Sequence, residues 1–186
     1  MRPKSMVKGL ASGLVGGLAA SWVMNQVQSR LSSAFEDTNK PHGAQSTQNG
    51  SPRHGVASEL RKRDLDDEDD NAAERTANFV ADKVFDHELS ESGKEAGGEL
   101  AHYVFGATTG AIYGAASELM PSAAVAAGLP FGAAVWLIAD EIVVPALGLS
   151  KPANEYPVSK HAIALSSHLV YGLMTDFLRR LTRRAL

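Results

Sequence analysis

Four apolar stretches of nearly bilayer-crossing length divide this chain, at residues 7–27, 100–119, 123–149 and 161–178. An α-helix needs roughly 20 residues to cross the hydrocarbon core of a membrane. Charge in hydrocarbon is costly, so ionisable groups in such stretches usually face the interior of a bundle. The sequence therefore predicts an all-α integral membrane bundle of four transmembrane helices with a polar interior. The embedded ionisable residues are His102, Glu118, Asp140, Glu141, His161, His168 and Asp176.

The mean hydropathy of the whole chain is −0.13, which at first opposes this interpretation. Residues 29–98 explain the low average, because they hold 9 Lys and Arg against 15 Asp and Glu, a net charge of −6. The chain has no cysteine, which excludes disulfides, thiolate nucleophiles and cysteine-based metal sites. We expect no nucleic-acid partner.

Arg2, Lys4 and Lys8 lie at the start of the first apolar stretch, a pattern shared by secretory signals and uncleaved membrane helices. Glycines at four-residue spacing favour the uncleaved helix, because they form a face on which another helix can approach closely. Residues 100–119 show the same four-residue spacing of glycines. The predicted helix-packing glycines are Gly9, Gly13, Gly17, Gly106, Gly110 and Gly114.

Composition divides the chain into five parts. We expect a first transmembrane helix over residues 1–28, then a disordered acidic linker over 29–70 whose apolar content is too low for folding. Residues 71–92 are predicted to form a short amphipathic helix at the outer end of the bundle, followed by a loop at Gly93, Gly97 and Gly98. Residues 99–181 form the three-helix transmembrane core, and 182–186 a basic cytoplasmic tail.

The basic residues at the two ends predict the orientation. Lys and Arg flanking membrane helices stay on the cytoplasmic side, so both termini are expected there. This requires an even number of crossings, which agrees with the four apolar stretches. The acidic linker and residues 150–159 are then expected on the outer side of a bacterial inner membrane.

This orientation gathers five titratable groups in the outer half of the bundle. They are His102, Asp140, Glu141, His161 and His168. Because neighbouring residues on a helix do not share a face, we expect Asp140 to face inward. Glu141 is expected at the interface or against a different helix.

Four interpretations of this cluster remain open. His168 and Asp140 can pair across helices and set the register of the bundle, or the cluster can respond to protons, since histidine changes charge near pH 6.5. A metal site of His161, His168 and Asp140 is disfavoured, because the two histidines lie two helical turns apart. Catalysis has little support, since no nucleophile with a positioned base and no HExxH or phosphate loop is present.

Several motifs resemble the YagU-like family of uncharacterised bacterial inner-membrane proteins. The similar runs are 102–106 (HYVFG), 132–136 (GAAVW), 139–141 (ADE), 144–149 (VPALGL) and 167–172 (SHLVYG), together with 20–24 (ASWVM) in the first helix. The resemblance covers about the first 27 and the last 90 residues and leaves out the acidic linker. It implies an integral inner-membrane protein of unknown activity, with a link to survival in acid.

From these observations we expect a non-enzymatic, multi-pass membrane protein, without a metal or another cofactor, whose histidine and carboxylate cluster responds to protons. The alternative is a structural or assembly partner that docks on another membrane protein through its glycine faces. A transporter or channel would need oligomers, because the chain is short. The expected partners are the lipid bilayer and either a second copy or another membrane protein.

Overall fold

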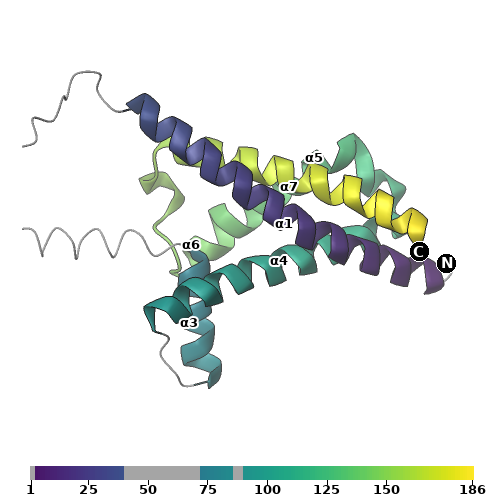
Figure 1. Cartoon of the computed structure of the whole chain (residues 1–186), viewed down its shortest axis with the longest axis horizontal. Coiled ribbons are helices and arrows are strands. Elements are labelled where there is room, and N and C mark those ends of the chain that lie inside the picture. The colour runs from purple at the N-terminus through teal and green to yellow at the C-terminus, as the bar shows by residue number, and fades with distance from the viewer. Residues whose placement is uncertain (1–2, 40–71, 86–89) are drawn as a thin grey trace, which may run out of the picture.

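Three long helices run side by side in this computed structural model, which describes residues 3–39, 72–85 and 90–186. Helix α1 (Pro3–Asn39) runs antiparallel to both α4 (Glu91–Leu119) and α7 (Val158–Ala185), as Figure 1 shows. It packs extensively on each of them, whereas the backbones of α4 and α7 come close at few points and the two helices are joined mainly by side chains. The beginning of α1 and the end of α7 therefore lie at the same end of the bundle. No strand occurs in the described ranges, so the all-α prediction is confirmed there.

Glycine allows α1 and α4 to meet backbone to backbone. A Cβ added to Gly13 would lie 2.2 Å from the carbonyl oxygen of Gly110, and one added to Gly17 would lie 2.3 Å from that of Gly106. A Cβ added to Gly9 would likewise lie 2.7 Å from the carbonyl oxygen of Gly114. Any side chain here would force the two helices apart, because the opposing atoms are backbone.

The predicted third helix is broken into four pieces. These are η1 (Pro121–Gly128), α5 (Leu129–Val135), the π-helix η2 (Trp136–Val143) and α6 (Val144–Ala146). The break in η1 comes from left-handed backbone at Ala126, Ala127 and Gly128, with φ of 48°, 53° and 82°. A Cβ at Gly128 would lie 2.3 Å from the carbonyl oxygen of Gly172, so this turn brings the chain directly against α7.

Three observed helix boundaries differ from the predicted ones. Helix α1 continues to Asn39, so residues 29–39 of the predicted linker are helical. Helix α4 begins at Glu91, where the Ser90 hydroxyl accepts a hydrogen bond from the Gly93 amide at 3.3 Å, so the glycines at 93, 97 and 98 are helical and the loop predicted there is wrong. Helix α7 continues through Ala185, so most of the predicted basic tail at residues 182–186 is helical.

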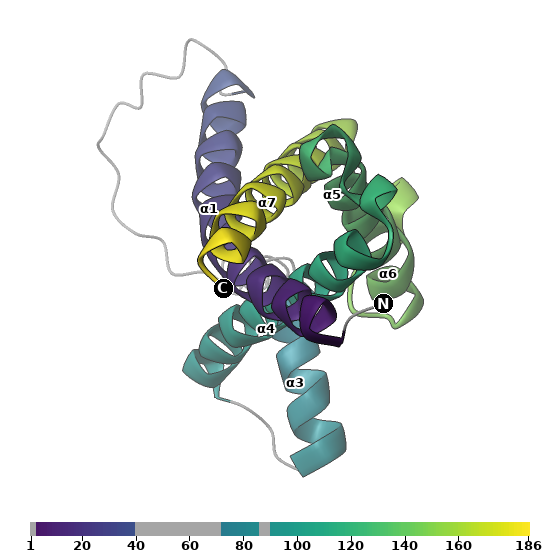
Figure 2. The same cartoon turned by 90° about the vertical axis from the view of Figure 1, so that its right-hand side faces the viewer.

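Helix α3 (Ala72–Phe85) lies within the predicted amphipathic stretch and packs on the first half of α4. Gly98 permits this contact, since a Cβ there would lie 2.8 Å from the Glu74 amide nitrogen. Figure 2 shows α3 projecting from the side of the bundle. Residues 40–70 of the predicted disordered linker, which was expected over 29–70, lie outside the described residues.

The distribution of polar and apolar side chains is the reverse of that in a water-soluble protein. The largest fully buried side chains are Thr175, Asp176, Ser12, Ser21 and Ser167. Large apolar side chains are exposed on every long helix, including Leu14 and Trp22 on α1, Ile112 on α4 and Phe177 on α7. Small and polar groups, together with Tyr113 and Tyr171, therefore form much of the interior, while many large aliphatic side chains and several aromatic ones lie on the outside.

Two segments of the described chain are long and apolar enough to cross a membrane, Ser5–Ala34 and Ser122–Ala146. Only 11% of the most apolar part of the Ser122–Ala146 segment is buried in the bundle. The predicted crossings in α4 and α7 are not among them, because both helices carry several polar residues on their inward faces.

Candidate functional site: a polar cavity and a histidine pair

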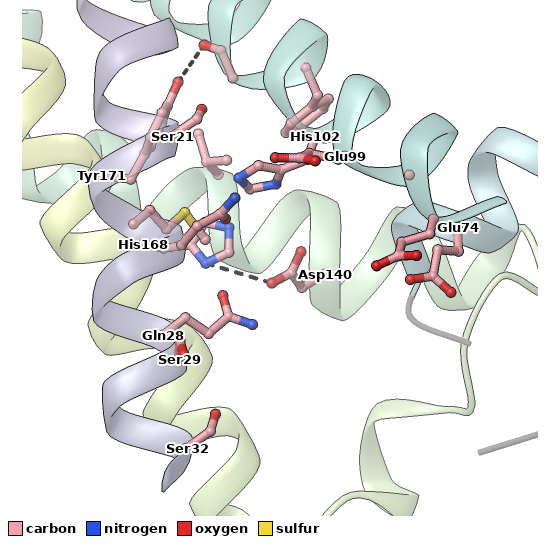
Figure 3. A pocket seen from close by; sticks show the side chains of 17 residues that line it. Ser21, Gln28, Ser29, Ser32, Glu74, Glu99, His102, Asp140, His168 and Tyr171 are labelled. Atoms are coloured by element: carbon pink, nitrogen blue, oxygen red, sulfur yellow. Dashed lines mark hydrogen bonds and ion pairs between the residues drawn. The ribbon is translucent and has the colours of Figure 1, made fainter. Parts of the chain in front are cut away.

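A cavity of about 650 Å³ opens between α1, α4, η2 and α7, at the end of the bundle away from the termini. Figure 3 shows His102, Asp140 and His168 around it, on three different elements. Asn25, Gln28, Ser29 and Ser32 of α1 add polar groups, and Glu74, Glu95 and Glu99 also contribute to the lining. No Lys or Arg is among the described residues that line the cavity. The cavity is therefore polar and rich in carboxylates.

His168 is the most buried of the histidines and carboxylates that line this cavity, with 9% of its side chain exposed. Its Nδ1 lies 2.9 Å from the Ala164 carbonyl oxygen one turn earlier in α7. A carbonyl only accepts, so Nδ1 carries the hydrogen and donates it. Nε2 has no hydrogen-bond partner among the described residues and can take up a proton.

Asp140 faces His168 from η2. Its Oδ2 lies 3.6 Å from Nδ1 of His168, within the distance of an ion pair when the ring is charged. The Asp140 side chain is 39% exposed, which leaves the carboxylate in contact with the open part of the cavity. If His168 takes up a proton, its charged ring would thus lie next to the negative Asp140 carboxylate.

His102 of α4 is a third ionisable residue beside His168 and Asp140 in the cavity. Its Nε2 is buried and has no hydrogen bond of good geometry within the described part of the chain, although the ring approaches the Ser21 backbone of α1. The imidazoles of His102 and His168 are close enough to influence each other electrostatically, and so are His102 and Glu99. The three elements therefore present two histidines and two carboxylates to one volume.

His161 and Glu141 form a separate pair at the rim, not part of the cavity. Nδ1 of His161 lies 2.6 Å from a Glu141 carboxylate oxygen, and its Nε2 lies 2.9 Å from the carbonyl oxygen of Ala153 in η3 (Ala153–Glu155). His161 lies in the first turn of α7, at the very start of the apolar stretch of that helix. Hydrogen bonding to the Glu141 carboxylate raises the pKa of His161 above its ordinary value.

The five sequence-predicted residues thus divide into two groups. His102, Asp140 and His168 share the cavity, while Glu141 and His161 meet outside it. Both carboxylates bind α7, so the expectation that Glu141 would meet a different helix is wrong, while its expected position at the membrane interface stays a prediction. In the ranges that the structure describes, no three His, Asp or Glu side chains gather closely enough to hold a metal ion.

Tyr171 forms the floor of the cavity, a role that sequence reasoning missed. Its hydroxyl donates to the Gly106 carbonyl oxygen at 2.6 Å and lies 2.9 Å from the Thr109 hydroxyl. Its ring packs with Met24 and Phe131 in a small apolar cluster below the cavity. The spacing of three residues from His168 placed Tyr171 on nearly the same face and could have indicated it.

A buried ionic network lies beyond this floor, near the end of the bundle that holds the termini. Asp176 is 1% exposed and accepts hydrogen bonds from Tyr113 at 3.0 Å, Arg179 at 2.8 Å and Arg180 at 2.7 Å. Nearby, Glu118 pairs with Arg183 at 2.7 Å. The sequence predicted Arg179 only as a flanking charge. Its i, i+3 spacing from Asp176 and its place on the face of His168 were the available signal.

Comparison with protein families supplies one match, a family of unknown function called DUF1440, over residues 81–177. The chain belongs to the DUF1440 family. The match begins inside α3 and ends at Phe177 of α7, so the DUF1440 region contains all five predicted site residues and leaves α1 outside. No curated protein and no solved structure matches the chain.

Proposed function

We propose that this protein is an integral membrane protein of four crossings in which the polar cavity takes up protons from the outer side. The inverted burial pattern supports the membrane location: serine, threonine and Asp176 are inside, while leucine and isoleucine side chains are outside. Helices α4 and α7 would cross with their polar faces against α1 and their apolar faces toward lipid. The proposed role is non-enzymatic.

The orientation is inferred from charge. Lys8 and the arginines at the end of α7 lie at one end of the bundle, and such basic ends favour the cytoplasmic side. The cavity lies at the other end and would open outward. Similarity to the YagU-like proteins would make this a bacterial inner membrane, where the outer side is exposed to environmental acid.

A single arrangement carries the functional part of the proposal. His168 donates only through Nδ1, keeps Nε2 available, and has the Asp140 carboxylate 3.6 Å away. Histidine is the side chain whose charge most readily changes in mildly acidic water. Uptake of a proton would turn a weak polar contact into an ion pair between α7 and η2, which gives the bundle two states that depend on pH.

Histidine NMR of the full chain in lipid nanodiscs tests this proposal. The chain has six histidines, and substituting His102, His161 and His168 by Gln one at a time would assign the three relevant signals. We expect the His168 ring to gain a proton between pH 8 and pH 4. The Asp140→Asn variant should keep the fold and change the His168 titration curve.

A His168 ring that stays neutral over this whole range would refute proton uptake. The His168–Asp140 contact would then serve only to set the register of the helices. A parallel test addresses the location: protein that stays in the supernatant after ultracentrifugation of lysed cells, without detergent, contradicts the membrane assignment.

The competing assignment, a partner that docks through its glycine faces, is weakened by the α1–α4 contact. Gly9, Gly13 and Gly17 already pack against Gly106, Gly110 and Gly114 of the same chain. An assembly partner or a second copy would therefore have to bind another face. Purification in mild detergent separates these cases, since a stoichiometric foreign protein would favour the assembly role.

A further inference from the structure

One histidine joins the segment before α7 to the π-helix. His161 lies between two acceptors, a Glu141 carboxylate oxygen at 2.6 Å from Nδ1 and the Ala153 carbonyl oxygen at 2.9 Å from Nε2. A carbonyl and an ionised carboxylate cannot donate, so both ring nitrogens must carry hydrogen. The geometry therefore corresponds to the charged imidazolium form of His161. The contact that His168 makes with its backbone acceptor requires a hydrogen on only one ring nitrogen.

The surroundings of His161 contain few other charges. Glu141 of η2 supplies the charge that acts on the ring in the described part of the chain. The segment before α7 contributes the Ala153 carbonyl, a backbone contact from Tyr156, and the Tyr156 ring, whose centroid lies 6.4 Å from that of the His161 ring. On α7 itself the adjacent charged residue is Lys160, which is exposed. Protonation of His161 is therefore governed mainly by Glu141.

The π-helix explains how two adjacent carboxylates reach one neighbouring helix. Asp140 meets His168, and Glu141 meets His161, two turns away on α7. Neighbouring positions on a regular α-helix point in clearly different directions. The wider π turn, with its i→i+5 hydrogen bonds, is uncommon and is found frequently at functional sites. The pairing with His161 is thus one of the contacts that favour this form of η2.

We propose that His161, Glu141 and Ala153 form a proton-operated clasp that regulates the cavity. In the charged state His161 holds both η2 and the segment around Ala153, and Asp140 stays beside His168. After loss of a proton, one of the two hydrogen bonds is lost and η2 is free to return to an α-helical turn. This regulation rests on the proposed function, because the clasp acts on the Asp140–His168 pair.

The direction of the pH effect follows from the raised pKa of His161. A group whose pKa is higher in the folded state stabilises that state fully below its ordinary value, near 6.5 for histidine. The contribution is then lost as the pH rises through the higher folded value. The clasp is therefore closed in acid and opens toward alkaline pH.

Hydrogen–deuterium exchange of the full chain in nanodiscs tests the clasp. Exchange rates for residues 136–143 and 150–157, corrected for the intrinsic effect of pH, should increase at least about tenfold between pH 6 and pH 9. The Glu141→Gln variant should already show the fast rates at pH 6. Lys160→Gln, which changes an exposed neighbour, should behave as the unaltered chain.

Histidine NMR supplies the second measurement. At pH 6 both ring nitrogens of His161 should be protonated, and Glu141→Gln should move its titration midpoint down toward 6.5. A single protonated nitrogen at pH 6, or equal exchange at both pH values, would overturn the clasp. Since these signals come from His161 and the test of proton uptake reads His168, the two proposals can fail separately.

Discussion

At the scale of single residues, the environment of each polar group decides what it can do. His161 has acceptors at both ring nitrogens, and His168 has a backbone acceptor at one. Asp176 is the opposite case: two guanidinium groups and a tyrosine hydroxyl donate to it, and only 1% of the residue is exposed. We therefore assign the first two residues to proton chemistry and Asp176 to stability.

Asp176→Asn should destabilise the protein strongly, because it leaves the Arg179 guanidinium buried with reduced compensation. Removing one partner of a buried ion pair typically costs about 3–5 kcal/mol. Tyr113→Phe removes one neutral donor from the same carboxylate and should cost about 1 kcal/mol. Thermal unfolding in mild detergent would rank the two variants. Equal effects would show that Asp176 is not the centre of the network.

At the scale of elements, the α1–α4 contact depends on the absence of side chains. Gly17→Ala would place a methyl group 2.3 Å from the Gly106 carbonyl oxygen, where no flexible side chain can move aside. Overpacking of this kind costs roughly 1–3 kcal/mol. Ala19→Val, two residues away on the exposed face of α1, serves as the control and should be close to neutral. Thermal unfolding measures both, and a Gly17→Ala protein as stable as the control would contradict the close contact.

Sequence periodicity predicted the helical class and most helix positions, because apolar runs and glycine spacing act locally. It could not predict the π turn at Asp140 and Glu141, where both carboxylates meet histidines supplied later in the chain by α7. Nor could it predict the left-handed turn at Ala126, which accompanies the close contact of Gly128 with α7. The sequence indicated the cavity residues His102, Asp140 and His168 because each is an ionisable residue within an apolar stretch. It did not indicate Tyr171, because a tyrosine does not stand out in such a stretch.

At the scale of the whole molecule, polar and apolar layers alternate along the bundle. The cavity with His168 lies at one end, the apolar cluster of Met24, Tyr171 and Phe131 lies below it, and the Asp176 network follows. An apolar layer between two polar ones separates the cavity from the opposite end. This order is suited to sensing protons from one side and does not by itself provide a path across.

The sidedness of the molecule can be measured directly, because the chain contains no cysteine. Asn154→Cys places a thiol at an exposed position before α7, and Ala185→Cys places one at the exposed end of that helix. A maleimide that cannot cross membranes should label the first variant while the membrane that holds the protein is intact and accessible to the reagent from outside, and the second variant only after lysis. Because basic ends stay in the cytoplasm, the reverse pattern would mean that the cavity faces inward. The cavity would then respond to cytoplasmic pH. Labelling of both variants before lysis, with the membrane shown to be intact, would contradict a helix α7 that crosses the bilayer.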